Sequence, residues 1–294
     1  MPELPEVEAN RRLLIPCAGH RVTAVHVPDP TSVRPALSTK SKDAGGAERL
    51  VALVGQVADV PTRRGKRLGW TFGPHGLLAH LGMTGRFVVA DAEPRWAKVG
   101  LTFEDGRTVW FVDPRRFGCV VPVDAALVPA ALSQGLGPDA LDAPQTGAQL
   151  AARFLTPRAI KVALLDQDRL AGMGNIHAVE ALWRAHLHPD TRCVDLDAKA
   201  WEALAGAITA QLHHGLDLVA ADGIAYLSDG VITNPFEVYG RAGEACRRCG
   251  GRIQGEVRAG RSTFWCPDCQ PQRAYSEAVT RSARSGRDGG ARVR

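Results

Sequence analysis

The chain has 294 residues and is 45 % hydrophobic, which is enough for one large domain or two smaller ones with buried cores. No stretch approaches the roughly 18 consecutive apolar residues of a membrane span. The chain opens with Glu3, Glu6 and Glu8 rather than with a basic and then apolar export signal. These features argue against a membrane protein and predict a cytoplasmic one.

The positive charge is concentrated at the C-terminal end. The formal net charge is +5, but residues 241–294 hold 12 Arg against 5 Asp and Glu, which leaves about −2 for residues 1–240. A local excess of this kind predicts a polyanionic partner, although residues 273–294 are also typical of a disordered, solvated basic tail.

The first 135 residues are predicted to be mainly strands behind one opening helix, in which Pro5 can occupy the first turn. The clearest local element is a β-hairpin. Residues 99–103 and 108–112 alternate apolar and polar side chains around the turn Glu104-Asp-Gly-Arg107.

Residues 126–146 are rich in Ala, Pro, Gly and Asp, and the pattern beyond them is helical, which predicts a domain boundary near residue 135. One apolar stripe recurs at steps of three and four and predicts a long helix with a buried face. The stripe consists of Trp201, Leu204, Ile208, Leu212, Leu216 and Val219.

Four cysteines near the C-terminus have the spacing of a zinc site. Cys246-Arg-Arg-Cys249 and Cys266-Pro-Asp-Cys269 form two C-x2-C pairs sixteen residues apart, and two tight turns of this kind present four thiolates tetrahedrally to Zn²⁺. Four thiolates leave no open coordination position, so a single structural zinc is predicted. The other cysteines, Cys17, Cys119 and Cys193, are predicted to be free thiols.

The N-terminus suggests a nucleophile beside an acid. Removal of Met1 would leave Pro2 with a secondary amine next to Glu3. An α-amino group has a reference pKa near 8 against about 10.4 for lysine, so more of it is neutral and able to form a Schiff base. A coincidental proline is the alternative for Pro2 taken singly.

Six features together resemble the formamidopyrimidine-DNA glycosylase family, over residues 2–270. The resemblance rests on the sequences PELPEVE at 2–8, Gly65-Lys66, HLGMTGRF at 80–87, DPRRFG at 113–118, GMGN at 172–175 and the four-cysteine module. It implies a bifunctional glycosylase and abasic-site lyase of base excision repair, acting as a monomer on damaged double-stranded DNA.

The resemblance also implies an α+β multidomain fold. A β-sandwich with an N-terminal helix would span 1–135, a helix-two-turns-helix domain 136–237 and a four-cysteine zinc finger 238–272, followed by the tail 273–294. DNA would bind between the two halves.

In the mechanism that the family implies, Pro2 attacks the sugar C1′ and Glu3 donates a proton that helps to open the sugar ring. Lys66 matches the lysine of β-elimination and Arg261 the zinc-finger arginine of δ-elimination. Because a guanidinium is a poor general acid, we expect Arg261 mainly to hold phosphate.

An extruded nucleotide leaves a gap in the duplex, and the resemblance implies that Met83 and Phe117 fill it while Arg115 contacts the opposite base. Glycines at the start of a helix would leave backbone N–H groups free for a phosphate, to which Asn175 adds a donor; a plain helix–helix turn is the rival interpretation. The other residues expected near DNA are His80, Lys98, Arg116, Arg158 and Lys161.

Three departures from the family pattern bear on specificity. His177 replaces a tyrosine, Lys98 replaces a histidine, and residues 228–241 are shorter than the segment that caps an extruded 8-oxoguanine. The preferred lesion and opposite base are therefore open, although oxidised purines are favoured because Leu4 stands where enzymes for oxidised pyrimidines of the endonuclease VIII type carry glycine.

Two alternatives lie outside this family of enzymes. A catalytically silent zinc-ribbon protein would be expected to have lost Pro2, Glu3 or Lys66, and all three are present. A metal-dependent nuclease would need carboxylates around an open metal site, and the sequence has no such acidic cluster.

Overall fold

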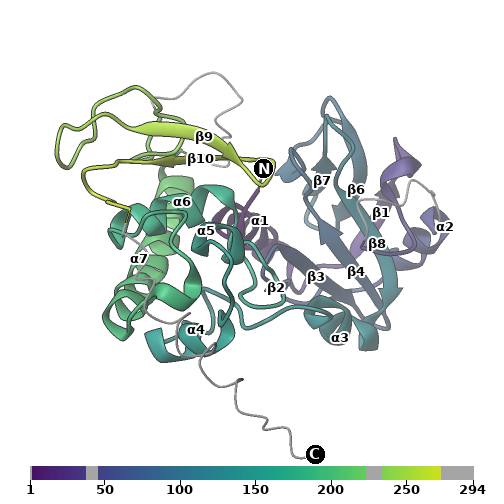
Figure 1. Cartoon of the computed structure of the whole chain (residues 1–294). Helices are drawn as coiled ribbons and strands as arrows, with labels where there is room; N and C mark the ends of the chain where they lie inside the picture. Colours follow the sequence, from purple (N-terminus) through teal and green to yellow (C-terminus); the bar gives the residue numbers. More distant parts are fainter. Residues whose placement is uncertain (1, 38–45, 223–233, 273–294) are drawn as a thin grey trace, which may run out of the picture.

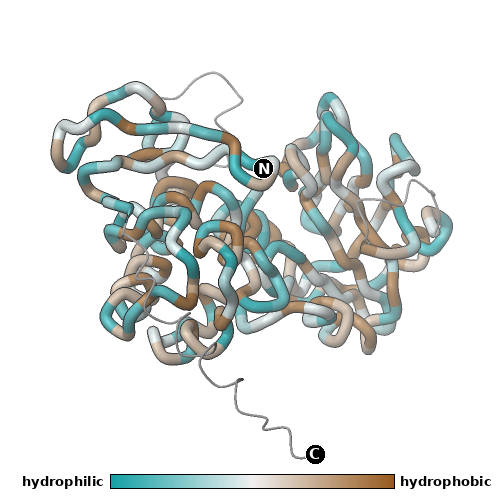
Figure 2. The backbone as a smooth tube through the Cα atoms, viewed as in Figure 1, coloured by the Kyte–Doolittle hydropathy of each residue, from teal (hydrophilic) through white to brown (hydrophobic). Residues whose placement is uncertain are grey.

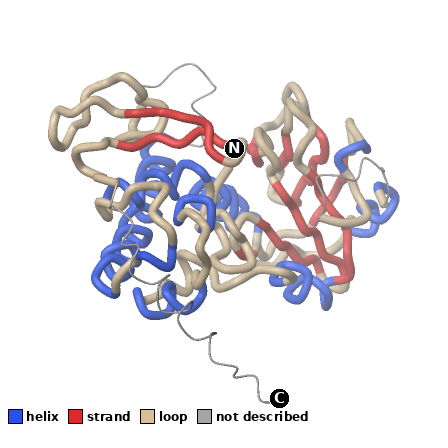
Figure 3. Tube along the Cα trace, in the orientation of Figure 1, coloured by secondary structure: helices blue, strands red, loops and turns tan. Residues whose placement is uncertain are grey.

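The computed structural model describes residues 2–37, 46–222 and 234–272. Strands gather in one half of the molecule and helices in the other, with a separate two-stranded hairpin above the helices (Figures 1 and 3). The first helix, α1 (Leu4–Leu14), lies between the halves and packs against both. This arrangement confirms the α+β class.

The N-terminal half contains two four-stranded antiparallel sheets, ordered β1-β6-β7-β5 and β2-β3-β4-β8. The predicted hairpin is confirmed, since Leu101 pairs with Val109 and Thr102 with Thr108. The strands are β1 (Val22–His26), β2 (Thr62–Arg64), β3 (Arg67–Phe72), β4 (His75–His80), β5 (Arg86–Val89), β6 (Ala97–Phe103), β7 (Thr108–Val112) and β8 (Cys119–Asp124).

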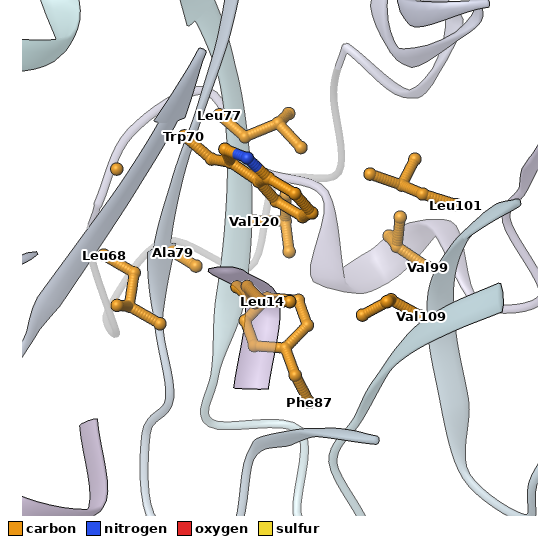
Figure 4. Close-up of a pocket in the computed structure, with 11 residues that line it drawn as sticks. Leu14, Leu68, Trp70, Leu77, Ala79, Phe87, Val99, Leu101, Val109 and Val120 are labelled. Carbon is orange, nitrogen blue, oxygen red and sulfur yellow. The ribbon is translucent and has the colours of Figure 1, made fainter. Parts of the chain in front are cut away.

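Apolar side chains of the two sheets fill the space between them. Figure 4 shows Trp70 and Leu77 on one side facing Leu101 and Val109 on the other, with Leu14 of α1 closing one end. Figure 2 shows hydrophobic residues along the strands of this half, mixed with hydrophilic ones. The remaining void has a volume of about 20 Å³, so the core is well packed and is a structural rather than a ligand-binding space.

Two short helices, α2 (Ala47–Leu50) and α3 (Val128–Ser133), add to the single helix predicted in this half. The second, α3, lies in the Ala- and Pro-rich stretch that predicted a domain boundary. It forms because Val128 and Leu132 pack over two glycines: a Cβ at Gly69 would lie 2.6 Å from Leu132 Cδ1, and Val128 fills the equivalent space at Gly76. This stabilisation is tertiary and leaves no periodic signal.

The helical half has its own core, which includes Leu4 of α1 together with Phe154, Trp201 and Leu204. The predicted long helix is confirmed as α7 (Ala198–Asp222), with Ile208 and Leu212 buried on its inner face. The other helices are α4 (Gly147–Arg153), α5 (Ile160–Ala163) and α6 (Asn175–Arg184).

The C-terminal hairpin consists of β9 (Gln254–Arg258) and β10 (Arg261–Trp265), with Arg258 paired to Arg261 at its turn. Figure 1 shows this hairpin extending above α5 and α6 toward the β-sandwich. Its small apolar cluster combines three of the four cysteines with Val238, Ile253 and residues of α6. Among the described residues, none of the helices has the length and apolar character needed to cross a membrane.

Glu8 is a buried carboxylate on α1 that accepts hydrogen bonds from Arg11, Arg12 and Arg63. Although desolvation opposes ionisation, these arginines lower the pKa of Glu8 from 4.5 to about 2. A carboxylate whose folded pKa lies below its unfolded value stabilises the fold above the unfolded pKa, and this contribution is lost as pH falls through the folded pKa.

We therefore expect Glu8→Gln to destabilise the protein by about 2 kcal/mol at pH 7, after allowance for solvent screening, and by progressively less between pH 4.5 and 2. Urea unfolding of both proteins at pH 7, 4 and 3 measures the difference. Glu48→Gln, at an exposed position on α2, is the matched control. A destabilisation of Glu8→Gln that is equal at pH 7 and pH 3 would contradict the prediction.

Candidate active site

Glu3 joins the N-terminus of the chain to the helical half. Its side chain is buried, and its two carboxylate oxygens accept the backbone N–H groups of Ile176 and His177 at 2.9 and 3.1 Å. These N–H groups belong to the first turn of α6, where the helix dipole favours a negative charge. The Glu3 carboxylate is thus held in a fixed position next to Pro2 in the chain.

Glu3 occupies the N–H groups of Ile176 and His177, so the phosphate predicted at the start of α6 would have to be held by other donors. The glycines of the 172–175 loop have a steric purpose instead: a Cβ at Gly174 would overlap the carboxylate of Glu3, and one at Gly172 would overlap Leu4. Glycine is needed because the loop passes directly against the first residues of the chain. The rival interpretation, a plain helix–helix turn, also misses this contact.

Lys66 crosses from the β-sandwich to the same loop. It lies in the tight turn between β2 and β3, and its Nζ donates to the carbonyl oxygen of Met173 at 2.8 Å. Burial lowers the pKa of Lys66, and Arg261 acts in the same direction, whereas Glu3 and Glu6 oppose the shift. A lowered pKa makes more of the neutral amine available for proton removal.

A basic hollow of about 240 Å³ lies between the helical half and the turn of the C-terminal hairpin. Lys161 is fully buried there, and among the described residues its Nζ has no hydrogen-bond partner. Burial lowers the pKa of Lys161 to about 8, and Arg261 adds to the effect. Arg158 also lines the hollow and is paired with Asp166 at its edge.

The DPRRFG segment forms an exposed loop that is organised by Asp113, a residue the sequence did not single out. Asp113 is fully buried and accepts hydrogen bonds from Thr84 Oγ1 at 2.6 Å and Gly118 N at 2.7 Å. The Phe117 ring is 42 % exposed, and the Arg115 guanidinium lies 5.2 Å from its centroid. An exposed apolar ring on a loop that is held by buried hydrogen bonds to Asp113 is suited to insertion between bases.

Two further predicted contacts lie beside this loop. Met83 is half-buried in the turn that Thr84 ties to Asp113. Burial lowers the pKa of His80 to about 4, with Lys66 as a smaller cause, so the ring is neutral at physiological pH. Its Nδ1 accepts the Gly82 N–H at 3.0 Å, which leaves the proton on Nε2.

Lys98 and Arg116 share one carboxylate instead of facing outward independently. Lys98 is buried, and its Nζ lies 2.7 Å from Asp29 Oδ2, while Arg116 Nε lies 3.2 Å from the same oxygen. Arg116 is exposed, but a DNA contact by Lys98 would first require its ion pair to open.

Asn175 and His177 both lie at the start of α6. Asn175 Nδ2 donates to the carbonyl of Ser262, which ties the helix to the C-terminal hairpin. His177 is buried with its Nδ1 3.2 Å from Gln211 Nε2, so this departure from the family is accommodated by packing against α7. Of the segment 228–241, residues 228–233 lie outside the described residues, as does the predicted tail 273–294.

The four cysteines predicted to bind zinc converge. All four Sγ atoms lie within 4.8 Å of one another, with Cys246 and Cys269 at 3.9 Å and Cys249 and Cys266 at 3.5 Å. Four sulfur ligands at this separation fit one tetrahedral Zn²⁺. The site is structural, because it joins the two cysteine turns that flank the β9–β10 hairpin. It thereby supports the exposed hairpin turn that carries Arg261.

Comparison with known proteins agrees with this architecture. Residues 1–120 match the formamidopyrimidine-DNA glycosylase N-terminal domain, residues 136–225 its H2TH domain, and residues 243–272 the zinc finger found in FPG and IleRS. A curated formamidopyrimidine-DNA glycosylase of Acidothermus cellulolyticus is 39 % identical over 289 residues, covering 92 % of this chain and 98 % of the relative.

Two solved structures of Lactococcus lactis Fpg (MutM) are also similar. The complex with DNA containing N7-benzyl-Fapy-dG has a TM-score of 0.79 at 31 % identity, and the complex with DNA containing an oxidised pyrimidine has a TM-score of 0.78 at 29 % identity. Both cover 92 % of this chain and all of the Lactococcus chain. The chain therefore belongs to the formamidopyrimidine-DNA glycosylase family.

Proposed function

We propose that this chain excises oxidised purines, namely 8-oxoguanine and formamidopyrimidines, from duplex DNA and then cuts the strand by β,δ-elimination. The observation that carries the proposal is that Glu3, the residue after Pro2 in the chain, and Lys66 both bond to one loop between the two halves. An amine, a carboxylate and a second amine of lowered pKa are the groups that Schiff-base chemistry at a sugar requires.

In the proposed reaction, the Pro2 nitrogen forms a bond to C1′ and the glycosidic bond breaks, its electron pair leaving with the base. The Glu3 carboxylate accepts the proton that the Pro2 nitrogen loses and donates it to the ring oxygen as the sugar ring opens, which gives an iminium ion. The departed base takes its own proton from solvent. Lys66 then removes a C2′ proton, and the 3′ phosphate leaves. Met1 must first be removed, because the Pro2 nitrogen is otherwise part of a peptide bond.

The DNA contacts that we propose follow the exposed surfaces around this site. Arg115, Phe117 and Met83 would occupy the gap left by the extruded nucleotide. Arg261 would hold the phosphate of the second elimination through paired hydrogen bonds. The other proposed contacts are His80, Lys98, Arg116, Arg158, Lys161 and Asn175.

We also propose the domain division 1–135, 136–237 and 238–272, with a basic tail at 273–294. A single chain supplies all of these groups, which favours a monomer. Action on chromosomal DNA would take place in the cytoplasm, at the nucleoid.

Borohydride trapping tests the proposal. Protein from which Met1 has been removed is incubated with a duplex containing 8-oxoguanine opposite cytosine, and the covalent complex is expected with the wild type but not with Pro2→Gly. Trapping only on an oxidised-pyrimidine duplex would support the Schiff-base mechanism but show that oxidised pyrimidines are the substrate. The Lactococcus protein has been solved in complex with DNA of that kind. No trapping on these duplexes or on a pre-formed abasic duplex would sink the enzyme proposal.

A further inference from the structure

The loop that contains Ala171 and Met173 contacts Lys66 both at its backbone turn and at its side-chain amine. The turn of Lys66 begins at Gly65, whose φ of +55° is left-handed, and a Cβ there would lie 3.1 Å from Ala171 Cβ. The turn therefore packs against the loop whose Met173 carbonyl receives the lysine Nζ. Residues 137–140 run beside that loop, since Ala140 N donates to the carbonyl of Ala171.

Asp139, in residues 137–140, holds the turn that carries Lys66. Its side chain is 2 % exposed, and its Oδ2 accepts the Gly65 N–H at 2.6 Å and Arg63 Nη1 at 2.7 Å. Its Oδ1 accepts Arg63 Nη2 and the N–H of Asp142. Arg63 Nη1 also donates to the Gly65 carbonyl at 3.0 Å, so both polar groups of that residue are held by this one ion pair.

Arg63 is a buried charged residue that has no part in the proposed reaction steps. Its side chain is 1 % exposed and contacts three carboxylates, from Glu8 on α1, from Asp139 and from Asp142. Buried ion pairs contribute little net stability compared with apolar packing, so stability alone does not account for this one. The groups that it does fix are the backbone atoms next to Lys66.

We infer that Arg63 and Asp139 form a positioning pair that sets Lys66 against Glu3 and the N-terminal amine. The pair acts through the Gly65 backbone and touches no substrate. This inference rests on the proposed function, because it assigns the pair a part in the elimination step that Lys66 would perform. A turn that is free to shift would move the lysine Nζ away from its place at the Met173 carbonyl.

The test is single-turnover cleavage of a pre-formed abasic duplex by Asp139→Asn and by a matched control, Asp142→Asn. Asp142 also bonds Arg63, with Oδ2 2.7 Å from Nη2, but its side chain is 60 % exposed and does not contact Gly65. We expect Asp139→Asn to lower the rate by about tenfold to a hundredfold and Asp142→Asn to change it less than about twofold. The Kd for the duplex should stay unchanged in both.

A double-mutant cycle separates positioning from general destabilisation. In a Lys66→Ala background, Asp139→Asn is expected to have no further effect, because the residue through which it acts is already gone. If Asp139→Asn folds poorly, Arg63→Lys replaces it: the lysine keeps a charge among the three carboxylates but cannot bond Asp139 and the Gly65 carbonyl together, and its loss of rate should also vanish without Lys66.

Additive losses in the Lys66→Ala background, equal losses from the two aspartate variants, or an unimpaired Lys66→Ala protein would each overturn the inference. If the wild type and Asp139→Asn cleave the abasic duplex at the same rate, the positioning pair is refuted and the proposed function is not. A wild type that neither traps nor cleaves any of the damaged duplexes would refute the proposed function itself.

Discussion

Replacing Gly174 by alanine is expected to lower excision by at least about a hundredfold, the scale on which removal of a positioned general acid acts. The backbone of Gly174 is extended, with φ of −121° and ψ of −172°, so alanine can adopt its conformation. The new Cβ would instead overlap the carboxylate of Glu3. Glu3 would have to leave the N–H groups of Ile176 and His177, and the N-terminal residues would move with it.

The same change should destabilise the protein by about 2 to 4 kcal/mol, because two charge-assisted hydrogen bonds at a buried carboxylate are lost. Excision of 8-oxoguanine under single-turnover conditions and urea unfolding measure the two effects.

Gly206→Ala is the control, since its Cβ position on the exposed face of α7 has no neighbour within 4 Å. Its expected effect is neutral or slightly stabilising, as alanine is the better helix former. Excision by Gly174→Ala within twofold of the wild type would show that Glu3 does not depend on this contact.

Loss of zinc is expected to abolish strand cleavage while leaving most of the chain folded. The C-terminal hairpin has only a small apolar cluster, to which three of the cysteines belong, and a segment of this size is not stable without its metal. Without the metal, Arg261 would no longer be placed opposite Lys66 and Lys161. The β-sandwich and the helical half have separate cores and should keep their secondary structure.

Cys249→Ser is the most direct variant, because Cys249 is exposed and its replacement changes ligation with little effect on packing. We expect it to lower bound zinc from one ion per chain, measured by elemental analysis, and to lower binding and cleavage of an abasic duplex by more than about a hundredfold. Cys193→Ser, at a buried thiol outside the metal site, should retain both zinc and cleavage. Full cleavage by a zinc-free protein would show that the hairpin needs no metal.

Local patterns in the sequence were sufficient for several parts of this protein. Alternation around the Asp-Gly turn defines the β6–β7 hairpin, because both strands and their turn lie within sixteen residues. The steps of three and four from Trp201 define α7, and the spacing of the two cysteine pairs defines the zinc site. In each case the interacting residues are close in sequence or follow the period of one element.

Only the tertiary structure decided the contacts that give the site its geometry. Glu3 accepts N–H groups more than 170 positions away, and Arg63 meets Asp139 across 76 positions. The sequence likewise places Lys98 where a DNA contact is expected, but does not reveal that it is buried against Asp29. Carboxylates and cations carry no periodic signal, since any one of them is equally compatible with solvent until the fold brings a partner within hydrogen-bonding distance. The sequence by itself therefore determined which chemical groups this protein carries, and the packing of its two halves decided which of them meet.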